Sequence, residues 1–221
     1  MKIASLATLI NRAFQFAIIS SEKYHIDESH AVRHSLDVYH YASQIYNSEL
    51  PNNPFLIEQQ PVIYASAILH DMCDKKYMEE SYGLMEIRDH MKGYMTNDHL
   101  DAMSDIISTM SYSKVMRVGY PDLAKYQLSY HIVREADLLS GYDVTRSMIY
   151  QLMHEQYEYT ESLQVVEDLF NKRMFKYVSD NLFITDFSKQ MANYLHEQAI
   201  YSIAELHNLQ PPDPPSNTFR W

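Results

Sequence analysis

One short stretch of the sequence decides the fold: residues 62–71 read VIYASAILHD. Its first eight residues carry no charge, and a run without a polar face is typical of an element that is buried on all sides. His70 and Asp71 follow this run directly. Burying polar groups without partners costs about 1 to 3 kcal/mol each, and more for a charge. The stretch therefore predicts a buried helix that ends in two metal ligands, because a bound cation would compensate this loss.

The rest of the chain also indicates helices. Four glycines in 221 residues is a low number, and no window alternates apolar and polar residues for long enough to suggest a sheet. Pro61 fits the first turn of the helix that carries His70, and Asp27 or Ser29 can cap the helix before it. We expect an all-α fold of about eight to nine helices, the others lying at about 5–24, 78–95, 98–110, 121–140, 143–159, 161–182 and 186–207.

Composition excludes several classes of function. A net charge of −11 argues against a surface for a nucleic acid polymer, which needs clustered lysine and arginine. Cys73 is the one cysteine, so the monomer has no internal disulfide, as is typical of a reducing compartment. The apolar residues 2–10 are too few to span a membrane and continue at helical spacing, unlike a signal peptide. We expect a cytoplasmic protein without a membrane partner.

Two further candidate ligands lie far from residues 62–71. His34 precedes them and Asp137 follows them, each within a helical pattern of its own. Helical bundles build metal sites from side chains on facing helices, so four donors on separate segments can converge on one ion. Two imidazoles and two carboxylates suit one divalent transition metal (Mn, Fe, Ni, Co or Zn) better than Ca.

A histidine, an adjacent His-Asp pair and a distant aspartate on helices resemble the pattern of the HD-domain phosphohydrolase superfamily. The segments ILHDMCDKKY (68–77), IISTMSYS (106–113) and VREAD (133–137) look like its nucleotide pyrophosphohydrolase-like branch. The resemblance implies a single-domain HD-type helical bundle. The resemblance covers about residues 25–160, which would form the metal-binding core. We expect residues 1–24 to pack on this core, residues 161–207 to complete the same domain, and residues 208–221 to form a proline-rich tail.

The resemblance also implies an activity and a set of site residues. His34, His70, Asp71 and Asp137 would coordinate one metal, and metal-activated water would hydrolyse a nucleotide or deoxynucleoside triphosphate to monophosphate and pyrophosphate. Asp71 and Asp74 are the predicted catalytic residues, since Asp74 could orient a ligand histidine or take a proton from the attacking water. The side chains predicted to bind the small phosphorylated substrate are Lys75, Lys76, Lys114, Arg117, Arg134 and Tyr142.

Other functions stay open at this point. A phosphodiesterase or a nucleoside monophosphatase would use the same ligands. A di-iron HD-type oxygenase would need a second metal, for which His131 is a candidate ligand. A non-catalytic module that binds a nucleotide would keep the helices without the chemistry. The sequence also leaves open whether the protein forms a homo-oligomer.

Overall fold

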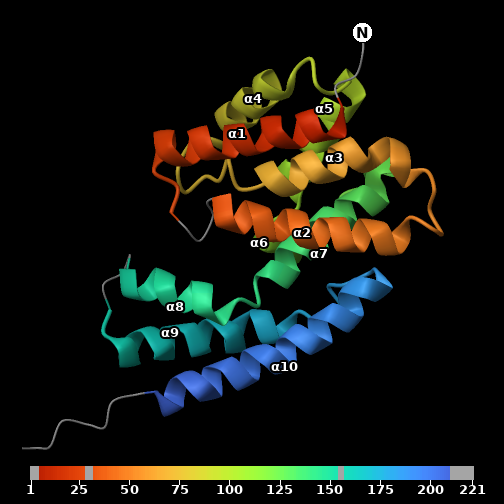
Figure 1. Cartoon of the computed structure of the whole chain (residues 1–221). Coiled ribbons are helices and arrows are strands. Elements are labelled where there is room, and N and C mark those ends of the chain that lie inside the picture. The colour runs from red at the N-terminus through yellow and green to blue at the C-terminus, as the bar shows by residue number, and fades with distance from the viewer. Residues whose placement is uncertain (1–4, 28–31, 154–156, 210–221) are drawn as a thin grey trace, which may run out of the picture.

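The computed structural model describes residues 5–27, 32–153 and 157–209. These residues form ten α-helices and two short 3₁₀ turns, with no β-strand among them (Figure 1). The predicted all-α class is confirmed, while the predicted number of helices is too small by at least one. The helices are α1 Leu6–Tyr24, α2 Val32–Glu49, α3 Leu56–Leu69, α4 Glu80–Met91, α5 Asn97–Thr109, α6 Tyr112–Val118, α7 Gln127–Ser140, α8 Val144–Met153, α9 Tyr159–Lys172 and α10 Asp186–Asn208, and the 3₁₀ turns are η1 Ala124–Tyr126 and η2 Met174–Lys176.

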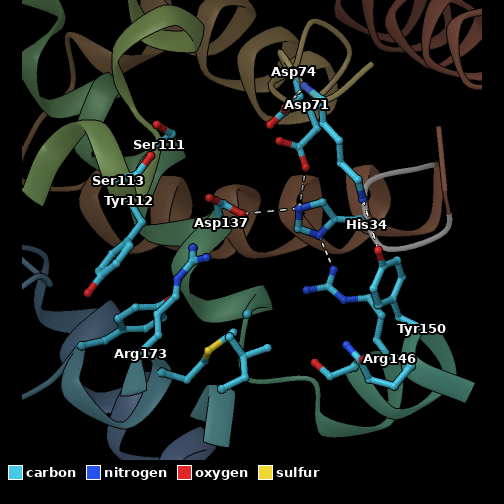
Figure 2. A pocket seen from close by; sticks show the side chains of 17 residues that line it. His34, Asp71, Asp74, Ser111, Tyr112, Ser113, Asp137, Arg146, Tyr150 and Arg173 are labelled. Atoms are coloured by element: carbon cyan, nitrogen blue, oxygen red, sulfur yellow. Dashed lines mark hydrogen bonds and ion pairs between the residues drawn. The ribbon is translucent and has the colours of Figure 1, made fainter. Parts of the chain in front are cut away.

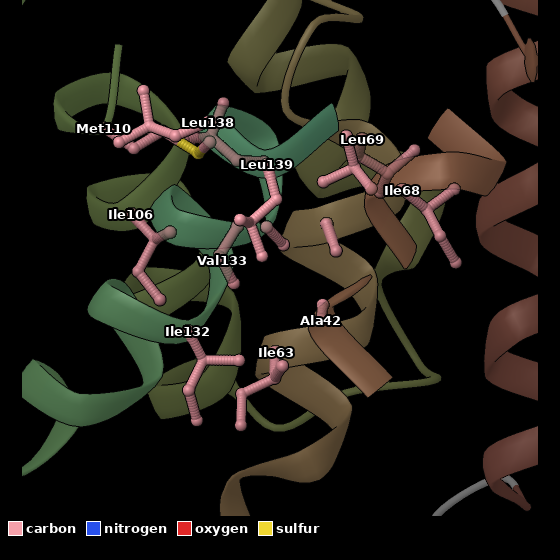
Figure 3. Packing of buried hydrophobic residues seen from close by; sticks show 14 of the residues in the cluster. Ala42, Ile63, Ile68, Leu69, Ile106, Met110, Ile132, Val133, Leu138 and Leu139 are labelled. Atoms are coloured by element: carbon pink, nitrogen blue, oxygen red, sulfur yellow. The ribbon is translucent and has the colours of Figure 1, made fainter. Parts of the chain in front are cut away.

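Helix α3 lies at the centre of the larger group of helices. Each of residues 62–69 is buried, and α3 packs against α1, α2, α5 and α7. Ile63 and Leu69 of α3 belong to one hydrophobic cluster with Ile106 of α5 and with Ile132 and Leu139 of α7 (Figure 3). A helix that is apolar all round needs such neighbours on every side. The core therefore fixes the end of α3, where His70 and Asp71 lie.

The start of α3 differs from the prediction. The helix begins at Leu56, so Pro61 lies inside it rather than in its first turn. The backbone N–H of Leu56 donates to the carbonyl of Asn53, and Leu56 is fully buried. The preceding turn thus leads straight into a helix that is anchored in the core. Packing of the helix overrides the loss of one intrahelical hydrogen bond at proline, which costs about 3 kcal/mol in an isolated helix.

Helix α6 was not predicted. The expected helices leave residues 111–120 between them, but Tyr112–Val118 form two turns of helix. The helix ends at Gly119, whose φ of 79° lies in the region that favours glycine. A segment this short has too few residues for an apolar period to be visible in the sequence.

Helices α8, α9 and α10 form a second group beside α2 and α7 (Figure 1). The carboxylate of Glu135, on α7, accepts hydrogen bonds from the backbone N–H groups of Ile184 (2.7 Å) and Thr185 (3.2 Å), where α10 begins. This buried carboxylate ties the second group to the first. In the described residues, no helix is both long and apolar enough to cross a membrane. The predicted tail lies outside the described residues from position 210 onward.

Candidate metal centre

The four predicted ligands come from three different helices. His34 is in the first turn of α2, His70 caps the C-terminus of α3 and Asp71 follows it, and Asp137 lies in α7. Because α2 and α7 both pack against α3 and against each other, their side chains meet at the end of α3.

The donor atoms lie close together. His34 Nε2 and His70 Nε2 are 3.2 Å apart. Asp71 Oδ2 lies 3.2 Å from His34 Nε2 and 3.3 Å from His70 Nε2, and Asp137 Oδ1 lies 3.4 and 3.6 Å from the same two atoms. Ligand atoms at about 2.1 Å from one ion are roughly 3.0 Å apart at right angles and roughly 3.4 Å apart at tetrahedral angles. His34, His70 and Asp137 therefore lie close enough together to share one metal ion, and Asp71 lies beside both imidazoles.

The charges of the cluster favour the binding of a cation. Burial by itself lowers the pKa of His70, but the charges and hydrogen bonds of Asp71 and Asp137 outweigh burial and hold that pKa well above its ordinary value. Burial by itself raises the pKa of both carboxyl groups, yet the contacts with the two imidazoles hold both pKa values well below the ordinary range. Two ionised carboxylates therefore remain beside the same pair of buried imidazoles. Without a metal, a proton on His70 supplies part of the compensating charge.

A backbone contact sets the orientation of His70. Its Nδ1 lies 3.0 Å from the carbonyl oxygen of Ala67, which only accepts hydrogen bonds, so Nδ1 carries a proton and donates. Nε2 then faces the cluster. Histidine ligands of metals are commonly held by this kind of hydrogen bond to the other ring nitrogen.

His34 has a different second contact. The guanidinium of Arg146, on α8, donates to His34 Nδ1, and Ser140 Oγ lies 3.4 Å from the same nitrogen. A neutral imidazole that binds a metal through Nε2 carries its proton on Nδ1, and such a nitrogen cannot accept from arginine. Ser140 Oγ is the acceptor available to that proton. Metal on His34 and the contact with Arg146 therefore exclude each other.

The cluster opens into a cavity of about 390 Å³ between α2, α6, α8 and α9 (Figure 2). His34, Asp71 and Asp137 lie on one wall of it. Arg146 and Arg173 extend toward them from the opposite wall, as Figure 2 shows. A ligand in this cavity would touch the donor cluster and both guanidinium groups. Its other polar or aromatic lining includes Asp74, Lys76, Ser111, Tyr112, Ser113, Tyr150 and Tyr177.

A smaller cavity of about 110 Å³ lies on another side of the same cluster. His70, Asp71 and Asp137 line it together with Lys75 and Lys114. Donor groups of the cluster thus face two cavities. The larger one has room for a substrate.

Several of the predicted site residues lie beside the cluster. Asp74 lines both cavities and accepts from the backbone N–H of Lys76 at 2.7 Å. Lys76 lines the large cavity but is paired with Asp27 at 2.8 Å. Lys114 lines the small cavity, where it is paired with Glu80 and donates to the carbonyl of Ser108 at 2.7 Å. Of the predicted lysines, only Lys75 lines a cavity without a carboxylate ion pair among the described residues.

Three predicted substrate-binding residues lie elsewhere. Arg134 is 1% exposed, and its guanidinium donates to the carbonyl of Leu182 at 2.6 Å. It therefore stabilises the segment before α10 and lines neither cavity beside the cluster. Arg117 lines a separate hollow beside Gly119 and Tyr120. Tyr142 is buried, packs edge-on against Tyr177 and lines a third hollow near Arg33. In each case the direction of the side chain, which spacing along a helix fixes only loosely, decides the outcome.

The predicted role of His131 in a second metal site is not supported by its position. His131 contacts Gln127 at 3.2 Å and stacks edge-on with Tyr120. Burial, with a smaller effect from the charge of Arg134, lowers the pKa of His131 to about 4. Across the described residues, the only group of donors close enough to share an ion contains His34, His70 and Asp137. Asp71 is not a member of that group, although its Oδ2 lies 3.2 and 3.3 Å from the two imidazole nitrogens.

Sequence reasoning missed Arg146, Arg173 and Tyr150 among the cavity residues. All three come from α8 and α9 or the residue that follows α9, where apolar and polar residues alternate at the spacing of an ordinary amphipathic helix. A cation on such a helix looks the same in the sequence whether it faces solvent or a cavity. The one available signal was that Arg146 follows Asp137 by little more than two helical turns.

Comparison with known proteins adds a likeness in fold. No family model and no curated protein matches the chain. The crystal structure of a structural genomics target from Lactobacillus plantarum is similar, with a TM-score of 0.61 and 20% sequence identity over 93% of this chain and 99% of that chain. At this identity the likeness concerns the arrangement of the helices alone.

Proposed function

We propose that the protein is a metal-dependent phosphohydrolase of the HD type, with one divalent transition metal held by His34, His70, Asp71 and Asp137. The observation that carries this proposal is the position of the two imidazoles, 3.2 Å apart, with Asp71 and Asp137 each within 3.6 Å of both, beside a cavity with cationic side chains on its far wall. Oxygen and nitrogen donors of this kind suit Mn, Fe, Ni, Co or Zn.

When bound, such a metal lowers the pKa of a coordinated water and neutralises charge on a phosphoryl group. The protein supplies the other requirements of hydrolysis. Asp74 lines both cavities beside the cluster, so its carboxylate is available to accept a proton from an attacking water. Arg146 and Arg173 face the cluster and can hold the negative charge of a substrate in place.

The proposed substrate is a nucleotide or deoxynucleoside triphosphate that is cleaved to a monophosphate and pyrophosphate. The cavity volume of about 390 Å³ lies in the usual range for small-ligand sites. Tyr112 and Tyr150 offer aromatic surface in the same cavity, to which a base can stack. The protein has a net charge of −11, which repels a phosphorylated substrate, and the cations in the cavity would offset this repulsion.

The test is to purify the protein, load it with Mn²⁺, and incubate it with a panel of nucleoside and deoxynucleoside triphosphates. We expect release of pyrophosphate from at least one of them, measured together with the metal content of the protein. Release of single phosphates, or cleavage of a phosphodiester, would place the protein among monophosphatases or phosphodiesterases instead. No release from any compound, with one metal per chain confirmed, would count against hydrolysis.

Elemental analysis distinguishes hydrolysis from di-iron oxidation. We expect one metal ion per chain, because one group of donors is present in the described residues. A content close to two irons per chain would contradict this expectation.

A further inference from the structure

Two arginines from different elements lie on the wall of the large cavity that faces the donor cluster. Arg146 belongs to α8, and Arg173 follows the last residue of α9. Both are half-buried, and both point toward the donor cluster in Figure 2. Among the described residues neither has an ion pair with a carboxylate, whereas Lys76 and Lys114 do. These two guanidinium groups are therefore the cavity charges that a ligand can neutralise.

The side chain of Arg173 is held in a fixed position. Its guanidinium carbon lies 4.6 Å from the centre of the Tyr112 ring, and its Nε donates to the hydroxyl of Tyr177 at 2.7 Å. Stacking and this hydrogen bond use the face and the Nε proton of the guanidinium. Both terminal nitrogens have no hydrogen-bond partner among the described residues, and they form the planar fork that suits a phosphate.

The second arginine is held from the other side. Arg146 donates to the carbonyl of Ser140 at 3.0 Å, a contact that does not depend on His34, and in the metal-free protein it also donates to His34 Nδ1. Its guanidinium thus lies next to a metal ligand. A ligand group that touches Arg146 is therefore close to the metal position, and Arg173 lies across the cavity (Figure 2).

We propose that Arg146 and Arg173 form a clamp for the second phosphate of a diphosphate or triphosphate chain whose first phosphate lies at the metal cluster. The cavity would then select chains of linked phosphates over a single phosphate. This inference rests on the proposed function, because it takes the donor cluster to hold a metal that contacts a phosphoryl oxygen. The selection of substrate would then depend on Arg146 of α8 and on Arg173 after α9, which lie outside the segments that carry the metal-binding side chains.

The test compares the binding of inorganic pyrophosphate and inorganic phosphate by calorimetry. Free Mn²⁺ is kept in excess so that neither probe removes metal from the protein. We expect the wild-type protein to bind pyrophosphate at least about tenfold more tightly than phosphate, since the second phosphate adds charge-assisted hydrogen bonds. Arg146→Gln and Arg173→Gln should each reduce this preference to within about threefold.

Lys172→Gln is the matched control. Lys172 adjoins Arg173 and carries the same charge, but its side chain is 75% exposed and pairs with Asp168. Its loss should leave the preference within about twofold of wild type. Arg173→Lys keeps the charge without the planar fork and should give an intermediate preference. It also serves if the glutamine variant does not fold, as judged by circular dichroism.

The clamp is overturned if the wild type shows no preference for pyrophosphate, if both arginine variants keep it, or if Lys172→Gln removes it to the same extent. These outcomes are separate from the fate of the proposed function. A protein that prefers pyrophosphate but cleaves no nucleotide would retain the clamp and lose the hydrolase. If the protein cleaves nucleotides and both arginine variants still prefer pyrophosphate over phosphate, the hydrolase is retained and the clamp is lost.

Discussion

The two walls of the large cavity belong to different kinds of structure. The ligand wall is the edge of the core: His34 and His70 are 4% and 7% exposed, and α2, which carries His34, packs against α3, which ends at His70. The cationic wall is built from α8 and α9, where Arg146 and Arg173 are half-buried. Interiors that are tightly packed hold donor atoms in place, which a metal needs. A more open wall can differ between proteins without disturbing the core, so substrate preference can reside there.

The largest expected effect comes from the ligand wall. Asp71→Asn should weaken metal binding at least about 100-fold, more than the loss of a group that only supports a ligand, and should abolish turnover. Calorimetry and metal analysis measure this. The metal-free variant should melt within a few degrees of wild type, because the amide oxygen of asparagine can still accept a hydrogen bond from the neighbouring imidazoles.

Asp105→Asn, at an exposed position on α5, is the control for the loss of one negative charge. It should bind metal as the wild type does. If Asp71→Asn kept its metal while losing much of its stability, Asp71 would be a structural hydrogen-bonding residue rather than a ligand.

The next prediction concerns the free energy of unfolding, and it tests whether Arg134 has a structural role or binds a ligand. Arg134→Ala should lower the free energy of unfolding by about 3 to 5 kcal/mol, because it leaves the buried carboxylate of Glu135 without its neighbouring charge. Urea unfolding measures this. Arg88→Ala, which breaks an exposed pair with Asp101, should cost less than about 1 kcal/mol. An Arg134 variant of wild-type stability with weakened substrate binding would restore the role predicted from the sequence.

Metal binding should depend on pH. The pKa of His70 is held well above its ordinary value in the metal-free protein, so at neutral pH the metal must displace a proton from this ring. Affinity should therefore fall as the pH falls, by about tenfold per pH unit while one proton is displaced. Calorimetry in two buffers of different ionisation enthalpy measures the released proton. An affinity that is constant between pH 6 and pH 8 would show that His70 is already neutral.

The same raised pKa links pH to the stability of the metal-free protein. A histidine whose folded pKa lies above its unfolded value of about 6.5 contributes stability that is complete below that value. This contribution is lost as the pH rises through the folded pKa of His70. The melting temperature of the metal-free protein should therefore decrease by a few degrees as the pH rises above about 6.5. His70→Gln should remove this dependence, and calorimetric melting at several pH values measures it.

The smallest effect tests whether the two walls are linked. Arg146→Gln should tighten metal binding by about two- to fivefold, because it removes a positive charge and a donor that competes for His34 Nδ1. Metal titration of the variant beside Lys172→Gln measures this change. The expected gain in metal affinity is opposite in sign to the expected loss of pyrophosphate affinity. Weaker metal binding in Arg146→Gln would mean that the arginine supports His34 as a ligand.

Sequence patterns predicted the ligand wall well and the cationic wall poorly. His34, His70 and Asp137 lie together, and Asp71 lies beside both imidazoles, as expected from donors on separate helical segments. The predicted substrate cations divide into two sets: Lys75, Lys76 and Lys114 line the cavities beside the cluster, whereas Arg117 and Arg134 lie elsewhere. The arginines that do face the cluster were not predicted.

The sequence by itself determined that residues 62–69 would be buried in a helix, since an apolar run without a polar face has no stable place at a surface. It also predicted a cluster of donor side chains at the end of this run, and His34, His70 and Asp137 lie together there. Only the tertiary structure decided which cations complete the cavity. Arg134 and Arg173 both lie in amphipathic patterns, and the docking of α8, α9 and α10 turns the first into the protein interior and the second toward the metal cluster.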